Sequence, residues 1–74
     1  MTNEELRAEY QTLIVTAAHI LLRAENAVTA AHDGKTPNEI AGTILDVPAQ
    51  LKQVSTLIET VLILNQRAAS GGRV

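Results

Sequence analysis

Residues 2–31 read TNEELRAEYQTLIVTAAHILLRAENAVTAA, and this stretch decides the fold. It opens with a Thr-x-x-Glu capping box, in which Thr2 accepts a hydrogen bond from the backbone of Glu5 at a helix start. Small or apolar residues then recur at alternating intervals of four and three, which keeps one stripe of a helix against a partner helix. This predicted packing stripe contains Leu6, Tyr10, Leu13, Ala17, Ile20, Ala24, Ala27 and Ala31. The pattern predicts a helix over about residues 3–31.

A short middle helix is predicted next. Gly34 follows the first helix and is suited to a left-handed C-terminal cap or turn. Residues 36–39, Thr-Pro-Asn-Glu, form a second capping box with proline at the first helical position, where its missing N–H costs nothing. The helix should cover about residues 37–45, with Gly42 weakening its middle.

A third helix is predicted over about residues 48–69. Pro48 separates it from the middle helix, because the residue before a proline avoids the helical region. Its predicted packing stripe contains Leu51, Val54, Ile58, Val61, Asn65 and Ala68. Asn65 is the polar member and would fix register or oligomeric state. Residues 70–74, Ser-Gly-Gly-Arg-Val, are predicted to be a flexible C-terminal tail.

These elements predict an all-α fold. Residues 1–69 would form a single domain, an antiparallel helical hairpin with a short middle helix. Further apolar residues fall outside the two packing stripes, and helices that are apolar on several sides are buried on several sides. One hairpin cannot bury them, so we expect a homo-oligomeric helical bundle, as a dimer or a larger ring. The expected oligomer interface contains Ile14, Val15, Leu21, Leu22, Leu57, Leu62, Ile63 and Leu64.

The composition and charge of the chain argue against several classes of function. The chain has six Lys and Arg against eight Asp and Glu, a net charge of −2, without a basic run. This charge distribution argues against non-specific electrostatic binding to nucleic acid or to an anionic membrane. The acidic start, MTNEE, does not resemble a secretory signal, so a cytoplasmic location is expected. The most apolar runs, residues 13–22 and 57–64, are shorter than the roughly 20 residues of a membrane span.

Catalytic and metal-binding patterns are missing from the sequence. There is no cysteine, and neither histidine has a second histidine or a carboxylate four residues away. No serine or threonine lies in a nucleophile elbow, and the four glycines form no phosphate-binding loop. We therefore expect no metal, no cofactor and no enzymatic activity.

Two groups of polar residues are candidates for ligand binding. Tyr10 is the only aromatic residue and could stack on a ring held between subunits, with Arg7 beside it. His19 and Arg23 are four residues apart on one helical face and could receive a phosphate or a carboxylate. The simpler interpretations are a core tyrosine with its hydroxyl at the rim, and a solvated helix edge.

Residues 40–54, IAGTILDVPAQLKQV, resemble a helix-turn-helix, with Ala41 in the first helix and apolar Leu51 and Val54 in the second. The resemblance implies DNA binding. The stretch departs from the motif at the usual turn glycine, which is Leu45, and its second helix offers only Lys52 as a cation. Three functions thus remain as hypotheses: a protein-binding adaptor or inhibitor, sequestration of a small anionic ligand such as a nucleotide between subunits, and a DNA-binding regulator.

Overall fold

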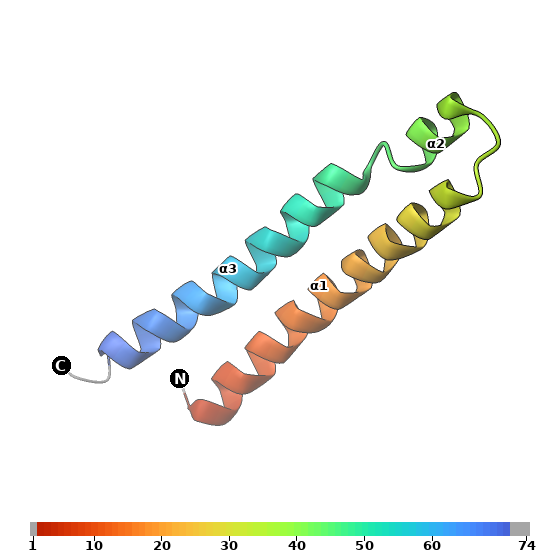
Figure 1. Ribbon diagram of the computed structural model, residues 1–74. Coiled ribbons are helices and arrows are strands. Elements are labelled where there is room, and N and C mark those ends of the chain that lie inside the picture. Colours follow the sequence, from red (N-terminus) through yellow and green to blue (C-terminus); the bar gives the residue numbers. More distant parts are fainter. Residues whose placement is uncertain (1, 72–74) are drawn as a thin grey trace.

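The computed structural model describes residues 2–71, which form two long helices and a short one between them. The long helices are α1, Asn3–His32, and α3, Val47–Gly71, and the short helix is α2, Pro37–Thr43. Figure 1 shows α1 and α3 side by side, running in opposite directions, with α2 at the end where the chain reverses. The described residues contain no strand, so the all-α prediction is confirmed.

The helix starts follow the capping residues found in the sequence. The Thr2 hydroxyl accepts a hydrogen bond from the Glu5 backbone N–H at 3.1 Å. The Thr36 hydroxyl accepts one from the Glu39 N–H at 3.1 Å, and the Glu39 carboxylate accepts one from the Lys35 N–H at 2.8 Å. The two hydroxyl groups satisfy backbone donors that the first turn of a helix leaves free, and the Glu39 carboxylate satisfies the N–H of the residue before the cap.

The helix ends differ by a few residues from the predicted ones. Helix α2 ends at Thr43, two residues early, and α3 begins at Val47, one residue before Pro48. Proline is tolerated there because the N–H groups of the first helical turn have no intrahelical partner. Helix α3 also continues through Ser70 and Gly71, which belong to the predicted tail, so the prediction is wrong for these two residues. The rest of that predicted tail, residues 72–74, lies outside the described residues.

The left-handed cap predicted at Gly34 is wrong. No described glycine has a positive φ angle. Helix α1 ends instead with Asp33 as its C-cap, where the Asp33 N–H donates to the Ala30 carbonyl and the Gly34 N–H donates to the Ala31 carbonyl. Glycine is needed at position 34 for space. A Cβ atom there would lie 2.7 Å from Cγ1 of Ile40 in α2 and 3.2 Å from the carbonyl oxygen of Ala31. The missing side chain lets α2 fold back onto the end of α1.

The packing stripe predicted for α1 is confirmed in full. Its eight residues are buried or half-buried, and all other residues of α1 are exposed. The three members spaced seven residues apart, Ala17, Ala24 and Ala31, are the most deeply buried. Small side chains at this spacing allow α3 to approach α1 closely along its length.

The packing stripe predicted for α3 is partly wrong. Val54 and Val61 face α1 as expected, whereas Leu51, Ile58 and Asn65 are exposed, as is Ala68. The residue just before each of the first three is buried more deeply. The observed packing stripe of α3 is Val47, Gln50, Val54, Leu57, Val61 and Leu64. Two stripes with the same spacing overlap on this helix, and the periodicity alone does not choose between them.

The resulting hydrophobic core is thin. Its buried residues are three alanines and two valines, and no larger side chain of the described residues is fully buried. The hairpin measures 59 × 17 × 11 Å and has a radius of gyration of 17.2 Å. A compact chain of this length would have a radius of gyration of about 11 Å. The molecule is therefore a single layer of two helices with little interior.

Candidate binding surfaces

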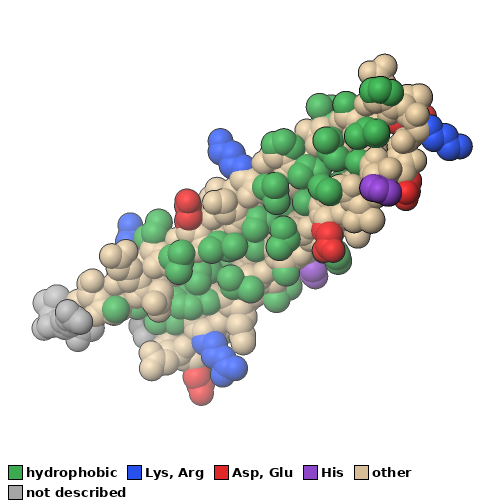
Figure 2. All heavy atoms as spheres, viewed as in Figure 1, with side chains coloured by type: hydrophobic (Ala, Val, Ile, Leu, Met, Phe, Trp, Pro, Cys, Tyr) green, Lys and Arg blue, Asp and Glu red, His purple; other side chains and the backbone are tan. Residues whose placement is uncertain are grey.

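One broad side of the hairpin carries large aliphatic side chains from both long helices. We call this surface the aliphatic face. Its six principal side chains are between 41% and 62% exposed. They are Ile14, Leu21 and Val28 of α1 and Leu51, Ile58 and Leu62 of α3. Figure 2 shows hydrophobic side chains in a nearly continuous band over both helices, with charged groups mainly along the edges.

Two shallow hollows show that the two sets of side chains belong to one surface. Ile14 and Leu21 line an apolar hollow of about 170 Å³ together with Val54 and Ile58 of α3. Leu21 also lines a neighbouring hollow of about 380 Å³ that extends to Leu51. Each hollow lies where the flank of α1 meets the flank of α3, so the aliphatic face is continuous across the groove between them.

The residues predicted for an oligomer interface fall into three groups. Ile14, Leu21 and Leu62 belong to the aliphatic face. Leu57 and Leu64 are half-buried in the packing stripe of α3, so the hairpin itself already uses them. The other three are exposed and, by helical periodicity, point away from the opposite helix of the hairpin. These are Val15 and Leu22 on α1 and Ile63 on α3.

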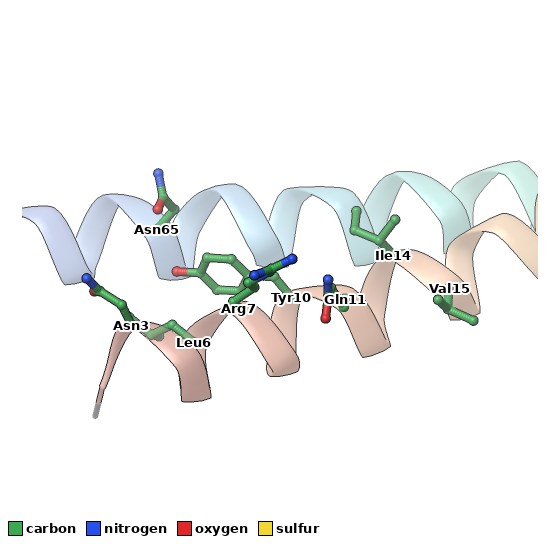
Figure 3. A pocket seen from close by; sticks show the side chains of 8 residues that line it. All are labelled: Asn3, Leu6, Arg7, Tyr10, Gln11, Ile14, Val15 and Asn65. Carbon is green, nitrogen blue, oxygen red and sulfur yellow. The ribbon is translucent and has the colours of Figure 1, made fainter.

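Arg7 and Tyr10, the first pair of ligand-binding candidates, are brought together near the start of α1. They line an open depression of about 610 Å³ that also receives Gln11 and, from α3, Asn65. Figure 3 shows the Tyr10 ring between the two helices. The Tyr10 hydroxyl oxygen is buried and has no hydrogen-bond partner. The depression thus offers a cation and an aromatic ring, whereas the Tyr10 hydroxyl oxygen itself is out of reach of solvent.

The structure does not add the second pair, His19 and Arg23, to this depression. His19 lines a separate open hollow of about 550 Å³ with Thr12 and Thr16. Arg23 is sixteen residues from Arg7, which corresponds to about 24 Å along the helix axis. One small molecule could not touch all four residues of one chain.

Metal and ionic contacts are sparse in the part of the chain from residue 2 to 71. It contains no cluster of three or more His, Asp or Glu side chains that could hold a metal ion. The only ion pair among these residues joins His32 Nδ1 and Asp33 Oδ1 at 3.3 Å, and both side chains are exposed. Exposed pairs of this kind contribute little to stability.

Residues 40–54, which resemble a helix-turn-helix in sequence, have a different geometry from that motif. The two helices of that motif are joined by a short turn and pack against each other. Here α2 packs against α1 and makes no contact with α3 among the described residues. Lys52, the one cation of the presumed recognition helix, is on the first part of α3, which packs along α1.

Helix α1 is long and apolar enough to cross a membrane when judged by length and composition alone. The apolar run within it, residues 13–22, is shorter than a membrane span, but the helix extends well beyond that run on both sides. Core helices of soluble proteins and N-terminal signal sequences meet the same criterion.

No protein-family model, no curated protein and no solved structure matches this chain. The class of the protein therefore rests on its own fold and surfaces. It is a small all-α protein built on two long helices, with a thin core and one extensive aliphatic face.

Proposed function

We propose that this chain is a small, non-enzymatic, cytoplasmic binding protein that assembles with itself through the aliphatic face and acts as an adaptor or an inhibitor of another protein. One observation carries the proposal. Most of the large aliphatic side chains lie on the surface of the hairpin, and its fully buried residues are only alanine and valine. Exposed apolar patches of this extent mark interaction surfaces.

The free energy of burying the aliphatic face favours assembly. Fully burying one large aliphatic side chain contributes about 1.5 to 3 kcal/mol. Each of the six side chains of the aliphatic face is about half exposed, so burying the rest of it would contribute roughly half of that free energy. The helices already hold their backbone conformation, so assembly orders only side chains. Several kcal/mol per chain is enough to stabilise a bundle of two or more hairpins.

A second set of apolar groups supports binding to a different protein. Val15, Leu22 and Ile63 would stay outside a bundle that buries the aliphatic face. At the closed end of the hairpin, Ile40 and Ile44 are more than a third exposed and Leu45 is 75% exposed. These groups give the assembly apolar contacts for a partner protein after self-association is complete.

Self-assembly is tested by measuring the mass of the protein by sedimentation over a wide range of concentration. The wild-type chain should be an oligomer, and Leu21→Glu or Ile58→Glu should convert it to a monomer. Thr12→Glu is the matched control, because Thr12 is exposed on the polar side of α1 and away from α3. A wild-type chain that stays monomeric at high concentration would refute the proposal.

The adaptor role is tested by a variant that leaves the aliphatic face intact. Val15→Glu combined with Leu22→Glu should keep the oligomeric mass and abolish capture of a defined partner identified with the wild-type protein. Dissociation of this variant would instead assign Val15 and Leu22 to the self-interface, as the sequence predicted.

A second candidate function is sequestration of a small anionic ligand, such as a nucleotide. The observation in its favour is the depression that combines the Arg7 guanidinium with the aromatic ring of Tyr10. A ligand that binds only the folded state raises its stability by mass action. Nucleotides at millimolar concentration should then raise the melting temperature of the wild-type chain but not of Arg7→Ala. No shift with any nucleotide of a broad panel would remove this candidate.

A further inference from the structure

We infer that the occupant of the aliphatic face is a second copy of this chain, related by a two-fold axis that places α1 antiparallel to the partner's α1 and α3 antiparallel to the partner's α3. The inference rests on the proposed self-assembly and specifies its geometry. It follows from the distribution of charge and of side-chain size on the face.

Helix α1 carries a second heptad stripe beside its packing stripe, which we call the outer stripe. Its members follow the same 4-3 spacing as the packing stripe, one position further along the chain: Arg7, Gln11, Ile14, Ala18, Leu21, Glu25, Val28 and His32. The two charged members have opposite sign, are both exposed and flank the apolar middle. They are equally far from Thr16, so an antiparallel copy centred there places Arg7 beside the partner's Glu25, and Glu25 beside the partner's Arg7.

The side chains of Arg7 and Glu25 cannot meet within one chain. Arg7 and Glu25 belong to the same straight helix and are eighteen residues apart, about 27 Å along its axis. Neither forms an ion pair within the described residues. An attraction between them can therefore operate only between copies.

The same axis also pairs large side chains with small ones. On α1 it sets Ile14 opposite the partner's Ala18, a large side chain against a small one. Helix α3 has its own exposed stripe, with Leu51, Ser55, Ile58 and Leu62 again spaced 4-3-4. Its midpoint lies between Thr56 and Leu57. An antiparallel copy about that midpoint sets Ile58 opposite the partner's Ser55, which repeats the pairing of large with small that lets helices interdigitate.

A single two-fold axis can serve both helices only if the two midpoints lie at the same level of the hairpin. They do, because Thr16 of α1 lines the same hollow as Thr56 and Leu57 of α3. The face is also large enough. The broad side of the hairpin is 59 Å long and 17 Å wide, of the order of the roughly 800 Å² per partner that stable interfaces bury.

A charge-exchange experiment tests this geometry. Arg7→Glu and Glu25→Arg should each weaken dimerisation on the order of tenfold, because each creates two repulsive pairs across the axis. The double variant Arg7→Glu with Glu25→Arg should return to within about twofold of the wild type, since both pairs are restored with reversed sign. Arg23→Glu, on the exposed polar side of α1, is the matched control and should leave the dissociation constant unchanged.

Cross-linking gives a second measurement, and the chain is suited to it because it contains no cysteine. An equimolar mixture of Ile14→Cys and Ala18→Cys chains should form a disulfide-linked heterodimer under mild oxidation, in much higher yield than either variant alone. If the wild type dimerises but the double charge variant is no tighter than the single ones, the two-fold geometry is wrong while self-assembly stands. A monomeric wild type would refute self-assembly itself.

Discussion

Gly34 and Ile40 are in contact across the reversal of the chain: a Cβ atom on Gly34 would lie 2.7 Å from Cγ1 of Ile40. This contact joins the end of α1 to the middle of α2 and sets how tightly the chain turns back. The requirement is for space, since the backbone of Gly34 is not left-handed.

Substitution of Gly34 by alanine should therefore destabilise the protein by about 1 to 2 kcal/mol, because the new methyl group overpacks against Ile40 and the Ala31 carbonyl. Gly42→Ala is the matched control. A Cβ atom there meets nothing within 4 Å and lies in a helix, so it should stabilise by about 0.5 to 1 kcal/mol. Urea unfolding of both variants at one protein concentration measures the difference. Equal stability of the two variants would contradict the space argument.

The cap of α2 offers a second prediction. Thr36→Ala removes the hydroxyl that accepts from the Glu39 N–H and should cost about 1 kcal/mol. Thr43→Ala removes a hydroxyl that only donates back to the Glu39 carbonyl, so its effect should stay within about 0.5 kcal/mol. Thermal unfolding monitored by circular dichroism compares the two. A neutral Thr36→Ala would show that α2 adds little to overall stability.

The unpaired polar atoms in the groove between the helices lead to a third prediction. Gln50 Oε1 is buried without a hydrogen-bond partner and lies in the packing stripe of α3. Gln50→Leu should stabilise the hairpin by about 1 kcal/mol or more, because it removes the desolvation penalty of the amide and adds apolar area. Gln53→Leu, at an exposed position of the same helix, is the control and should change stability much less. A melting temperature that falls with Gln50→Leu would show that the amide does find a partner.

The tyrosine hydroxyl can be examined in the same way. Tyr10→Phe removes a buried oxygen with no partner, so the melting temperature of the free protein should stay the same or rise slightly. Tyr10→Ala should lower it by several degrees through lost packing. If Tyr10→Phe instead destabilises the free protein, the hydroxyl does make a hydrogen bond within the fold.

The alanines of the α1 packing stripe give the last prediction. Ala24 is 2% exposed, and replacing it by leucine should cost at least about 2 kcal/mol, since α3 has to move away to accept the larger side chain. Ala8→Leu, at an exposed position of the same helix, should change stability by less than about 0.5 kcal/mol. Hydrogen exchange of the α3 amides would show whether protection falls along the whole helix or only in the turn that packs against Ala24.

Much of the fold was predictable because the signals were local. The capping boxes at Thr2 and Thr36 and the spacing of the α1 packing stripe predicted where helices begin and which residues of α1 are buried. The stripe of α3 was not predictable to the residue. Leu57 and Ile58 are adjacent and equally apolar, and only contact with α1 decides which of them is buried.

The candidate surfaces were predictable in part for the same reason. The sequence indicated that α1 has apolar residues beyond its packing stripe, but it did not show that Ile14 and Ile58 line one hollow. That relation depends on the level at which α3 runs back along α1. Likewise, the separation of Arg7 from His19 and Arg23 follows from the straightness of α1, which periodicity on a helical wheel does not display.

The reversal at Gly34 also orders the events of folding. Ala31 and Val47, on either side of it, are sixteen residues apart in the chain and both are buried, whereas Tyr10 and Asn65, which share a depression at the open end, are fifty-five apart. Closing the shorter loop costs less entropy, and each later contact then closes only a slightly larger one. The hairpin is thus expected to zip from its turn toward its open end and to fray in the reverse order, so the Arg7 and Tyr10 depression is the last region to form and the first to be lost.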